Sequence, residues 1–415
     1  MSPATRQIAF INTAHTFTHY CLLILATAAL GIVQQDTGRF GSEYGPVLAI
    51  GTAMFVLYGL GALPMGWLAE KLGRQTLMLI FFLGTGGCMA LAGFTSSPIL
   101  LGAALGGMGA FSAIYHPIGT AMLVDAAGDR VGRAVGLNGV FGNLGVATAP
   151  IITAFLATNY GWRWAFIVPG VLCVLVGLLY LREPVVDMVK AGGKRKPFPE
   201  IPTAIVRRAV TVLMLLAFSS GLIFNAFTLL LPKLMEERLA SSPDLLPVVG
   251  MLAFLATLCG GLTQFTVGRL IDRMTLRSLF LPLAALQVPV MLALSFAEGW
   301  IVLALSAATA AMIFGQVTVN ETMTARYIAP ALRAKLYSIR FTVGFVGAAA
   351  ASPLVGFMHE ATGTLAASIM VLAGFGSITL ACAFFFPNRR EELAPELWAE
   401  AHDAPRAPVG ATRSA

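Results

Sequence analysis

The chain has 415 residues, of which 57% are hydrophobic and only 11% are charged, whereas an average soluble domain has about 25% charged residues. This composition excludes an ordinary soluble enzyme. The formal net charge of +7 does not indicate nucleic-acid binding, because the basic residues are spread over many short segments between apolar runs.

Apolar segments of about 20 residues, the length that spans a bilayer core, recur along the chain. Six of them cover residues 7–33, 45–69, 75–96, 98–124, 134–157 and 162–181. Six more cover residues 208–232, 245–268, 278–297, 299–324, 335–358 and 364–386. We therefore predict an all-α membrane protein with twelve transmembrane helices. Two six-helix bundles, 1–181 and 208–387, are joined by a cytoplasmic linker, 182–207, and followed by a mobile cytoplasmic tail, 388–415.

The sequence from Gly66 to Lys71, GWLAEK, has a counterpart in the second half, GRLIDR from Gly268 to Arg273. Because each copy lies between two apolar segments, the two bundles are predicted to be related by a pseudo-two-fold axis, as in many secondary transporters. The glycines would let a neighbouring helix approach closely, and the carboxylates would cap a helix or pair with nearby cations when the bundles meet. The alternative is that these charges only set topology. The predicted gating residues are Gly66, Glu70, Lys71, Arg74, Gly268, Asp272 and Arg273.

The distribution of Lys and Arg predicts that both termini are cytoplasmic, because basic residues favour that side. All but four of the 27 basic residues then lie in cytoplasmic segments; the exceptions are Arg39, Arg163, Lys233 and Arg238. The first helix is expected to be retained rather than cleaved as a signal. No GxxxxGK[ST] phosphate loop occurs, so the expected energy source is a proton gradient and no cofactor is predicted. The five cysteines show no metal-ligand spacing and are expected to be core residues.

The motif at Gly66–Gln75 resembles the G-x-L-A-D-R-x-G-R-R loop of the major facilitator superfamily, with Glu70 for Asp and Lys71 for Arg. The second copy has Thr275 where the second glycine falls. The phrase GWRWAF at Gly161–Phe166 is also common in that superfamily. In that fold, helices one, four, seven and ten line a central cavity, which the resemblance implies here as well.

A finer resemblance links AHTFTH at Ala14–His19 and SAIYHP at Ser112–Pro117 to the fosmidomycin-resistance branch, which is associated with drug efflux. That branch carries acids where this chain has His19 and Ile118. The GNLGVATAP sequence at Gly142–Pro150 resembles the superfamily's antiporter motif, with Ala149 replacing a glycine, and would permit tight packing.

Histidines within membrane helices are functional candidates, because a buried ionisable group is costly and imidazole titrates near neutral pH. His15 and His19 are one helical turn apart and share a face. His116 is expected at a similar depth, in a helix that Pro117 should break locally. The alternative is that each imidazole only packs against a neighbouring helix. The predicted substrate and proton residues are His15, His19, Tyr20, Tyr115, His116, Asn143, Asn225, Gln316, Asn320 and Arg340.

Helix ten also carries Glu321, which is expected to pair either with Arg340 or with Arg326 near the interface. We interpret the chain as a secondary active transporter of a bacterial inner membrane, working by alternating access. The leading hypothesis is proton-coupled efflux of a small amphipathic or anionic compound by a monomer. An alternative is proton-coupled or facilitated uptake of a small organic acid or other metabolite, with Arg340 as counter-charge. A membrane enzyme with three histidine metal ligands is disfavoured, because no HExxH motif or carboxylate cluster accompanies them; no resident metal is expected.

Overall fold

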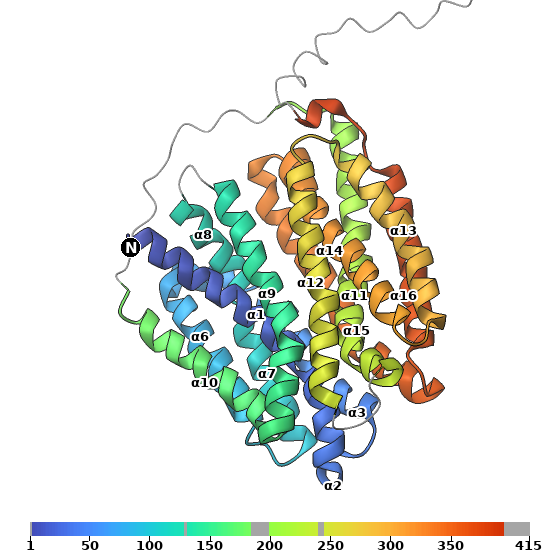
Figure 1. Ribbon diagram of the computed structural model, residues 1–415. Coiled ribbons are helices and arrows are strands. Elements are labelled where there is room, and N and C mark those ends of the chain that lie inside the picture. The colour runs from blue at the N-terminus through green and yellow to red at the C-terminus, as the bar shows by residue number, and fades with distance from the viewer. Residues whose placement is uncertain (1, 128–130, 184–198, 240–244, 394–415) are drawn as a thin grey trace, which may run out of the picture.

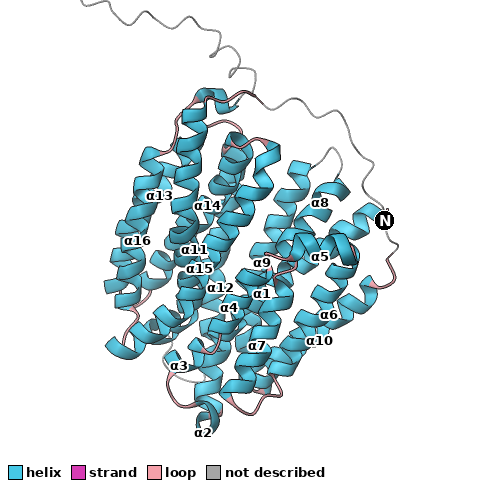
Figure 2. Cartoon of the chain, turned by 180° about the vertical axis from the view of Figure 1, so that it is seen from behind, coloured by secondary structure: helices cyan, strands magenta, loops and turns pink. Residues whose placement is uncertain are grey.

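The computed structural model describes residues 2–127, 131–183, 199–239 and 245–393, and every regular element in them is helical (Figures 1 and 2). Within these residues, 12 helical spans are long and apolar enough to cross a membrane. The spans cover Pro3–Gln35, Tyr44–Gly61, Arg74–Ala92, Pro98–Ala127, Gly136–Tyr160, Trp162–Tyr180, Thr203–Leu239, Leu246–Leu270, Leu276–Phe296, Ile301–Thr324, Ile339–Thr362 and Ala366–Phe385. The predicted fold class, an all-α chain of twelve membrane-spanning helices, is confirmed.

In the first half, one segment that was predicted as a single helix is divided into three helices. Its elements are α1 (Pro3–Gln35), α2 (Thr37–Phe40), α3 (Tyr44–Ala49), α4 (Thr52–Gly61), α5 (Met65–Leu72), α6 (Arg74–Ala92), α7 (Pro98–Ser112), η1 (Tyr115–Gly119), α8 (Thr120–Ala127), α9 (Val131–Tyr160) and α10 (Trp162–Tyr180). The continuous helix predicted over 45–69 is wrong, since the chain breaks after α3 and again before α5. Pro64 has no N–H to continue the hydrogen-bond ladder and disfavours helical geometry in the residue before it.

The second half repeats the pattern with fewer breaks. Its elements are α11 (Thr203–Leu239), α12 (Leu246–Leu270), α13 (Leu276–Phe296), α14 (Ile301–Tyr327), α15 (Pro330–Thr362), α16 (Ala366–Phe385) and a short 3-10 helix η4 (Arg390–Leu393). Because α11 begins at Thr203, the helix includes the last residues of the predicted linker. Most of that linker and most of the predicted tail lie outside the described residues, so the domain boundaries stay a prediction.

The two ends of the molecule differ in what they carry. The end that holds α8 and η4, at the top of Figure 1, is called the terminal face here; the end that holds α2 and α3, at the bottom, is called the distal face. The four basic residues that the topology prediction separates from the others belong to the distal end, in α2 and at the distal ends of α10 and α11. Two of them share one carboxylate: Arg163 lies 2.9 Å and Arg39 3.4 Å from Asp36.

The two halves of the chain meet closely near the distal face. Tyr44 of α3 donates its hydroxyl proton to the carbonyl oxygens of Ala26, at 3.1 Å, and Leu229, at 3.4 Å. Ser352 of α15 donates to the carbonyl of Leu48 at 2.7 Å. A Cβ atom added to Gly45 would lie 2.5 Å from the carbonyl oxygen of Gly356, so glycine is required for the two backbones to approach this closely.

We expect Gly45→Val to separate the halves at the distal face, because the valine side chain would overlap the α15 backbone. Overpacking of this kind costs at least about 1–3 kcal/mol. A Ser352→Cys background reports the change through the rate of labelling with a membrane-impermeant maleimide, which should rise. Gly38→Val is the matched control, since no atom of the described residues outside its own helical turn lies within 4 Å of a Cβ at Gly38. Equal labelling of both variants would contradict the packing role of Gly45.

The first residues of the predicted mobile tail are docked instead. The Glu392 side chain is fully buried and accepts hydrogen bonds from the backbone N–H of Leu276 and the hydroxyl of Tyr327. Arg326 lies 3.9 Å from the same carboxylate. The segment therefore ties the first turn of α13 to the end of α14, and the prediction of a free tail is wrong for residues up to Leu393.

Removing this carboxylate should lower the melting temperature of the protein in detergent. Glu392→Ala removes the acceptor of two buried donors, at a cost of about 1–3 kcal/mol each, while Glu392→Gln retains an acceptor oxygen and should lose less. An unchanged melting temperature in Glu392→Ala would mean that the segment is not docked in solution.

The same group gives the docking a pH dependence with a definite sign. Burial raises the pKa of the Glu392 carboxyl above its ordinary value, against the opposing effect of its hydrogen-bond donors. The folded chain then binds this proton more tightly than the unfolded chain, so the group's contribution to stability falls as the pH rises through the range between the two pKa values. Glu392→Gln should remove this part of the pH dependence of the melting temperature.

Candidate functional site

Three of the predicted site residues come together from two elements. His15 and His19 lie one turn apart on α1, and His116 lies in η1, a π-helical turn that follows the end of α7. The break predicted at Pro117 is confirmed. Because proline cannot donate a hydrogen bond to the preceding turn, the helix widens locally, and such turns are frequent at functional sites.

The three imidazoles form one cluster. The ring centroids of His15 and His19 are 4.9 Å apart, and His116 lies 5.4 Å from His15 and 5.6 Å from His19. One ring nitrogen from each residue lies within 4.8 Å of the other two. We call these residues the histidine triad. The sequence predicted their shared depth, and the structure brings them into contact.

The hydrogen bonds fix the tautomers of two rings. His15 Nδ1 lies 2.7 Å from the backbone oxygen of Asn138, and because a carbonyl oxygen only accepts, Nδ1 carries the proton. In the neutral ring His15 Nε2 is then a bare acceptor, so His19 Nε2, 3.1 Å away, donates to it. His19 Nδ1 is left as the acceptor of the pair. A proton taken up at His19 Nδ1 makes its ring cationic while the donated hydrogen bond stays in place.

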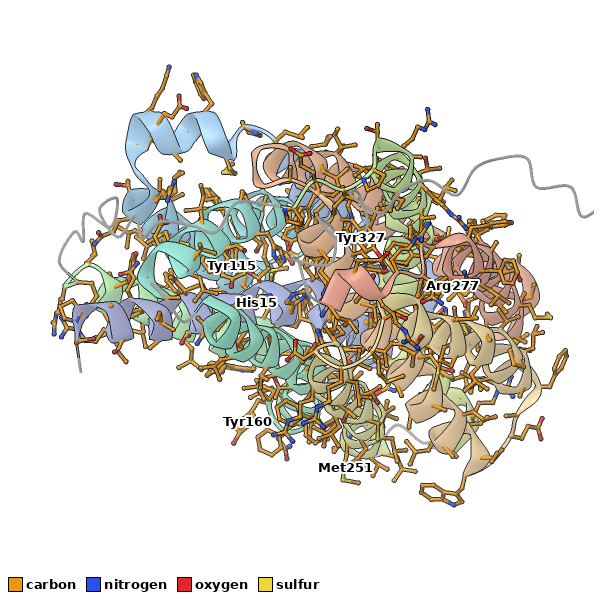
Figure 3. The ribbon with its side chains drawn as sticks, turned by 90° about the horizontal axis from the view of Figure 1, so that it is seen from above. His15, Tyr115, Tyr160, Met251, Arg277 and Tyr327 are labelled. Carbon is orange, nitrogen blue, oxygen red and sulfur yellow. The ribbon has the colours of Figure 1, made fainter. Side chains whose placement is uncertain are left out.

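Asn138 of α9 is the centre of the support behind His15. Its side-chain amide donates to Asn12 at 2.9 Å and to the Tyr115 hydroxyl at 2.8 Å, and it is buried. The Tyr115 ring in turn stacks on His15 with centroids 4.8 Å apart and an angle of 20° between the planes (Figure 3). The His15 ring is thus held by a hydrogen bond on one nitrogen and by a ring against its face.

Close packing of α9 against α1 depends on the glycines of the sequence at Gly142–Pro150. A Cβ at Gly142 would lie 2.6 Å from the His15 ring, and one at Gly145 would lie 2.2 Å from the backbone oxygen of Thr16. The tight packing predicted from this sequence is confirmed. Its effect is to seat the His15 imidazole directly against the α9 backbone.

The second half of the chain covers the triad with aromatic rings. Phe341 of α15 lies 5.4 Å from His116, ring to ring, and stacks against Phe345 at 5.8 Å. Phe345 packs on Tyr58 of α4 at 4.7 Å, and Tyr58 also reaches His116 at 6.3 Å. The three histidines remain only half-buried. The triad therefore lies where the two bundles meet, accessible along part of its surface.

Three other predicted site residues form hydrogen bonds inside their own bundle, and a fourth, Asn320, is buried there. Tyr20 contacts Thr153 at 3.4 Å, and Asn225 donates to Gly221 on its own helix at 2.8 Å. Gln316 donates to Gln287 of α13 at 2.6 Å and is buried. Asn320 is also buried, and its side-chain oxygen has no hydrogen-bond partner among the described residues. In the described state, Tyr20, Asn225 and Gln316 thus bond to residues of their own bundle, and their role in a cavity stays a prediction.

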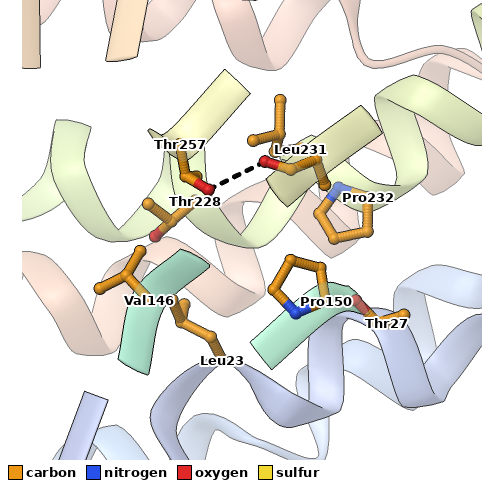
Figure 4. Close-up of a pocket in the computed structure, with 9 residues that line it drawn as sticks. Leu23, Thr27, Val146, Pro150, Thr228, Leu231, Pro232 and Thr257 are labelled. Carbon is orange, nitrogen blue, oxygen red and sulfur yellow. Dashed lines mark hydrogen bonds between the residues drawn. The ribbon is translucent and has the colours of Figure 1, made fainter. Parts of the chain in front are cut away.

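Asn143 bridges the two halves instead. It donates a hydrogen bond to Gln264 of α12, near Gly261, which closely approaches the same side chain. Closer to the distal face, Leu23, Thr27, Val146, Pro150, Thr228, Leu231, Pro232, Ala253 and Thr257 enclose a small pocket between α1, α9, α11 and α12 (Figure 4). The α9–α12 contact thus extends from the distal half to the middle of the molecule.

Arg340 of α15 is the charged residue among the predicted substrate and proton residues of the second half. It lies 3.6 Å from Glu321 and donates to the Thr324 hydroxyl at 2.6 Å. Of the two pairings predicted for Glu321, the one with Arg340 is observed. Arg326 instead donates to the Ile271 backbone and approaches Glu392. Arg340 directly precedes Phe341, so a cation and the ring over His116 are adjacent on one helix.

The predicted gating residues lie beyond these contacts, toward the terminal face. Glu70 and Asp272 are exposed, and within the described ranges neither forms an ion pair. Arg74 pairs with Asp125 at 2.5 Å, and Lys71 lies over the Trp67 ring at 3.9 Å.

The close helix approach expected at the motif glycines is absent in this arrangement. Among the described residues outside the glycine's own helical turn, nothing lies within 4 Å of a Cβ at Gly66, and only Thr318, at 3.9 Å, approaches one at Gly268. Thr275 caps the first turn of α13, the helix that follows Asp272, and the capping role of the motif carboxylates stays a prediction. Among the described residues, the two motif glycines thus make no close contact with the other bundle.

Sequence reasoning missed Asn138, Tyr58, Phe341 and Gln264. Asn138 had a readable signal, because it is an amide four residues before Gly142 in an apolar helix. The aromatic residues had none, since a Phe or Tyr in a membrane helix is as common against lipid as in a site.

We expect Asn138→Leu to lower the melting temperature in detergent, because it leaves the Tyr115 hydroxyl and the Asn12 amide without their shared partner. Each unpaired buried group costs about 1–3 kcal/mol. Tyr115→Phe is the matched comparison: it keeps the ring on His15 and removes one hydroxyl, so the loss should be smaller. Asn138→Leu that melts at the wild-type temperature would remove Asn138 from the support of the triad.

Two packed bundles of six membrane-spanning helices, with a polar cluster where they meet, define a secondary transporter. The sequence model of the Major Facilitator Superfamily matches residues 10–256 and again 213–414. The chain therefore belongs to this superfamily, and is a transporter rather than an enzyme.

Relatives and solved structures agree with this assignment. The chain is 26% identical over 255 residues to the multidrug resistance protein MdtG of Yersinia enterocolitica, covering 59% of each chain. It is 27% identical to the niacin transporter NiaP of Acinetobacter baylyi over 36% of this chain and 34% of that one. The matches thus span little more than half of these relatives at most. A bacterial homolog of the human lysosomal transporter Spinster, solved inward-facing and unoccupied, has a TM-score of 0.69 at 14% identity, over 96% of this chain and 98% of that one.

Proposed function

We propose that this transporter exports a small amphipathic or anionic compound across a bacterial inner membrane in exchange for protons, with the histidine triad as the proton site. The observation that carries the proposal is the convergence of three imidazoles under Phe341, a residue of the other bundle. A change of charge on the triad therefore acts directly on the contact surface between the bundles, which opens when they separate.

Protonation of the triad has a local consequence. Neutral rings allow the chain of hydrogen bonds from His19 to His15 to Asn138, while a second cation in the cluster is opposed by the first. The titratable residues whose rings contact the triad are Tyr58 and Tyr115. No carboxylate, lysine or arginine forms an ion pair with it in the part of the chain that the structure describes. A single bound proton, shared within the cluster, is therefore the proposed stoichiometric unit.

Orientation follows from the basic residues. The terminal face would be cytoplasmic, which places both termini inside and leaves Arg39, Arg163, Lys233 and Arg238 outside. The bundles touch from the distal face to the level of His116, so the described state would be inward-facing. In the outward-facing state the exposed motif carboxylates Glu70 and Asp272 would find their cationic partners.

Export is favoured by the glycines at α9 and by the multidrug resistance relatives. The fosmidomycin-resistance branch supplies the first compound to try. The proposed functional unit is a monomer, because both bundles and the contact between them belong to one chain.

A second candidate is uptake of a small organic acid, and Arg340 favours it. Arg340 belongs to α15, and its guanidinium is paired with Glu321, whose side chain is 53% exposed. An entering carboxylate could replace such an exposed partner at little desolvation cost.

Everted membrane vesicles with an imposed proton gradient test the leading proposal. Drugs and organic anions, fosmidomycin included, are added in turn, and a substrate is expected to collapse the gradient in wild type. His116→Ala and His19→Ala should lower the rate at least about tenfold, in line with the contribution of a positioned proton-transfer group. His402→Ala, beyond the described residues, serves as the histidine control.

The results of the vesicle and whole-cell assays test the role of the triad and distinguish export from uptake. Transport that persists in both triad variants with an unchanged pH dependence would rule out the triad as the proton site. If no compound discharges the gradient while labelled organic acids accumulate in whole cells, and Arg340→Gln abolishes that accumulation, uptake replaces export.

A further inference from the structure

We propose that His15, His19 and His116 also form a binding site for a divalent transition metal ion of the zinc class. This inference rests on the ligand geometry and does not depend on the transported compound or on proton exchange.

The ligand set has the spacing that zinc uses on helices. Two histidines at positions i and i+4 point from one helix face to a common ion in many zinc proteins, and His15 and His19 have this spacing on α1. His116 supplies a third nitrogen from η1. A Zn–N distance of 2.0–2.1 Å in tetrahedral geometry places ligand nitrogens about 3.4 Å apart. His15 and His19 nitrogens already lie 3.1 Å apart, and all three lie within 4.8 Å.

The surroundings of His15 are those of a metal ligand. Histidine ligands almost always donate the second ring N–H to a carbonyl or carboxylate, which orients the ring and fixes the tautomer. His15 Nδ1 donates to the Asn138 carbonyl at 2.7 Å, which leaves Nε2 directed at His19. The stacked Tyr115 ring holds the same plane. His15 Nε2, which accepts from His19 when no ion is bound, is thus already oriented, and an ion can replace this hydrogen bond when the His19 proton moves from Nε2 to Nδ1.

Three imidazoles leave one coordination position open for an oxygen ligand. The hydroxyl of Tyr58 is buried and has no hydrogen-bond partner among the described residues, and its ring packs against His116. It is the available donor to such a ligand. Because the three imidazoles are neutral, the bound ion keeps its full charge, which favours hydroxide or a carboxylate over a neutral molecule in the fourth position. Imidazole ligands suit Zn, Cu and Ni ions rather than Mg or Ca.

The test uses the full-length chain, purified in detergent without a polyhistidine tag and treated with chelator. Zn²⁺ is titrated in competition with a chromophoric chelator. Wild type is expected to bind one ion per chain, and His15→Ala, His19→Ala and His116→Ala should each weaken binding at least about tenfold. His359→Ala is the matched control, since His359 bonds Glu237 near the distal face and should leave the affinity unchanged.

A second measurement keeps the result independent of folding. Zn²⁺ should raise the melting temperature of wild type and of His359→Ala, because a ligand that binds only the folded state stabilises it. It should not raise that of His19→Gln, which replaces the ring by a side chain of similar reach. Co²⁺ should give wild type the visible absorption of a low-coordinate site, and this band should be missing in His19→Gln.

Two outcomes would overturn the proposal. One is a wild-type chain that binds no ion. The other is binding that survives every triad substitution, which would place the ion elsewhere. A wild-type chain that exchanges protons but binds no Zn²⁺ would contradict the metal site alone. A wild-type chain that binds Zn²⁺ but exchanges no protons would contradict the proposed transport cycle alone.

Discussion

Three imidazoles lie inside a membrane protein, where lipid offers no polar partner, so the protein itself must supply their polar contacts. The first bundle is built around that need. The π-helical turn at Pro117 brings His116 to α1, the missing side chain of Gly142 lets the His15 ring reach α9, and Asn138 supplies the acceptor. The backbone irregularities and the buried amide therefore follow from one polar cluster.

The cluster lies where the contact between bundles changes character. Below it, toward the distal face, the backbones approach each other closely at Gly45 and Gly356. At its level the contact consists of rings, Phe341 and Phe345 against His116 and Tyr58. Rings can slide or part with a smaller loss than interlocked backbones, so this layer is the natural place for the bundles to separate.

The terminal face carries charges arranged for a different contact. Arg74 is paired with Asp125 within its own half, while the repeated carboxylates Glu70 and Asp272 are exposed. In contrast, Glu392 is fully buried between α13 and α14. Buried carboxylates with several donors hold elements together, and exposed carboxylates are free to exchange partners. At the terminal face, a buried carboxylate thus holds helices of the second bundle together, while the motif carboxylates are exposed.

The twelve helices, the repeat and the shared depth of the histidines could be predicted from the sequence, because apolar length and charge placement act locally along the chain. The break at Pro117 and the glycine packing of α9 could be predicted as well, since both follow from missing atoms. Three contacts could be known only from the fold: Gln316 bonds Gln287, Glu321 pairs with Arg340, and Phe341 covers His116. The direction in which a side chain points depends on how helices rotate against each other, and that rotation is fixed by contacts between residues far apart in sequence.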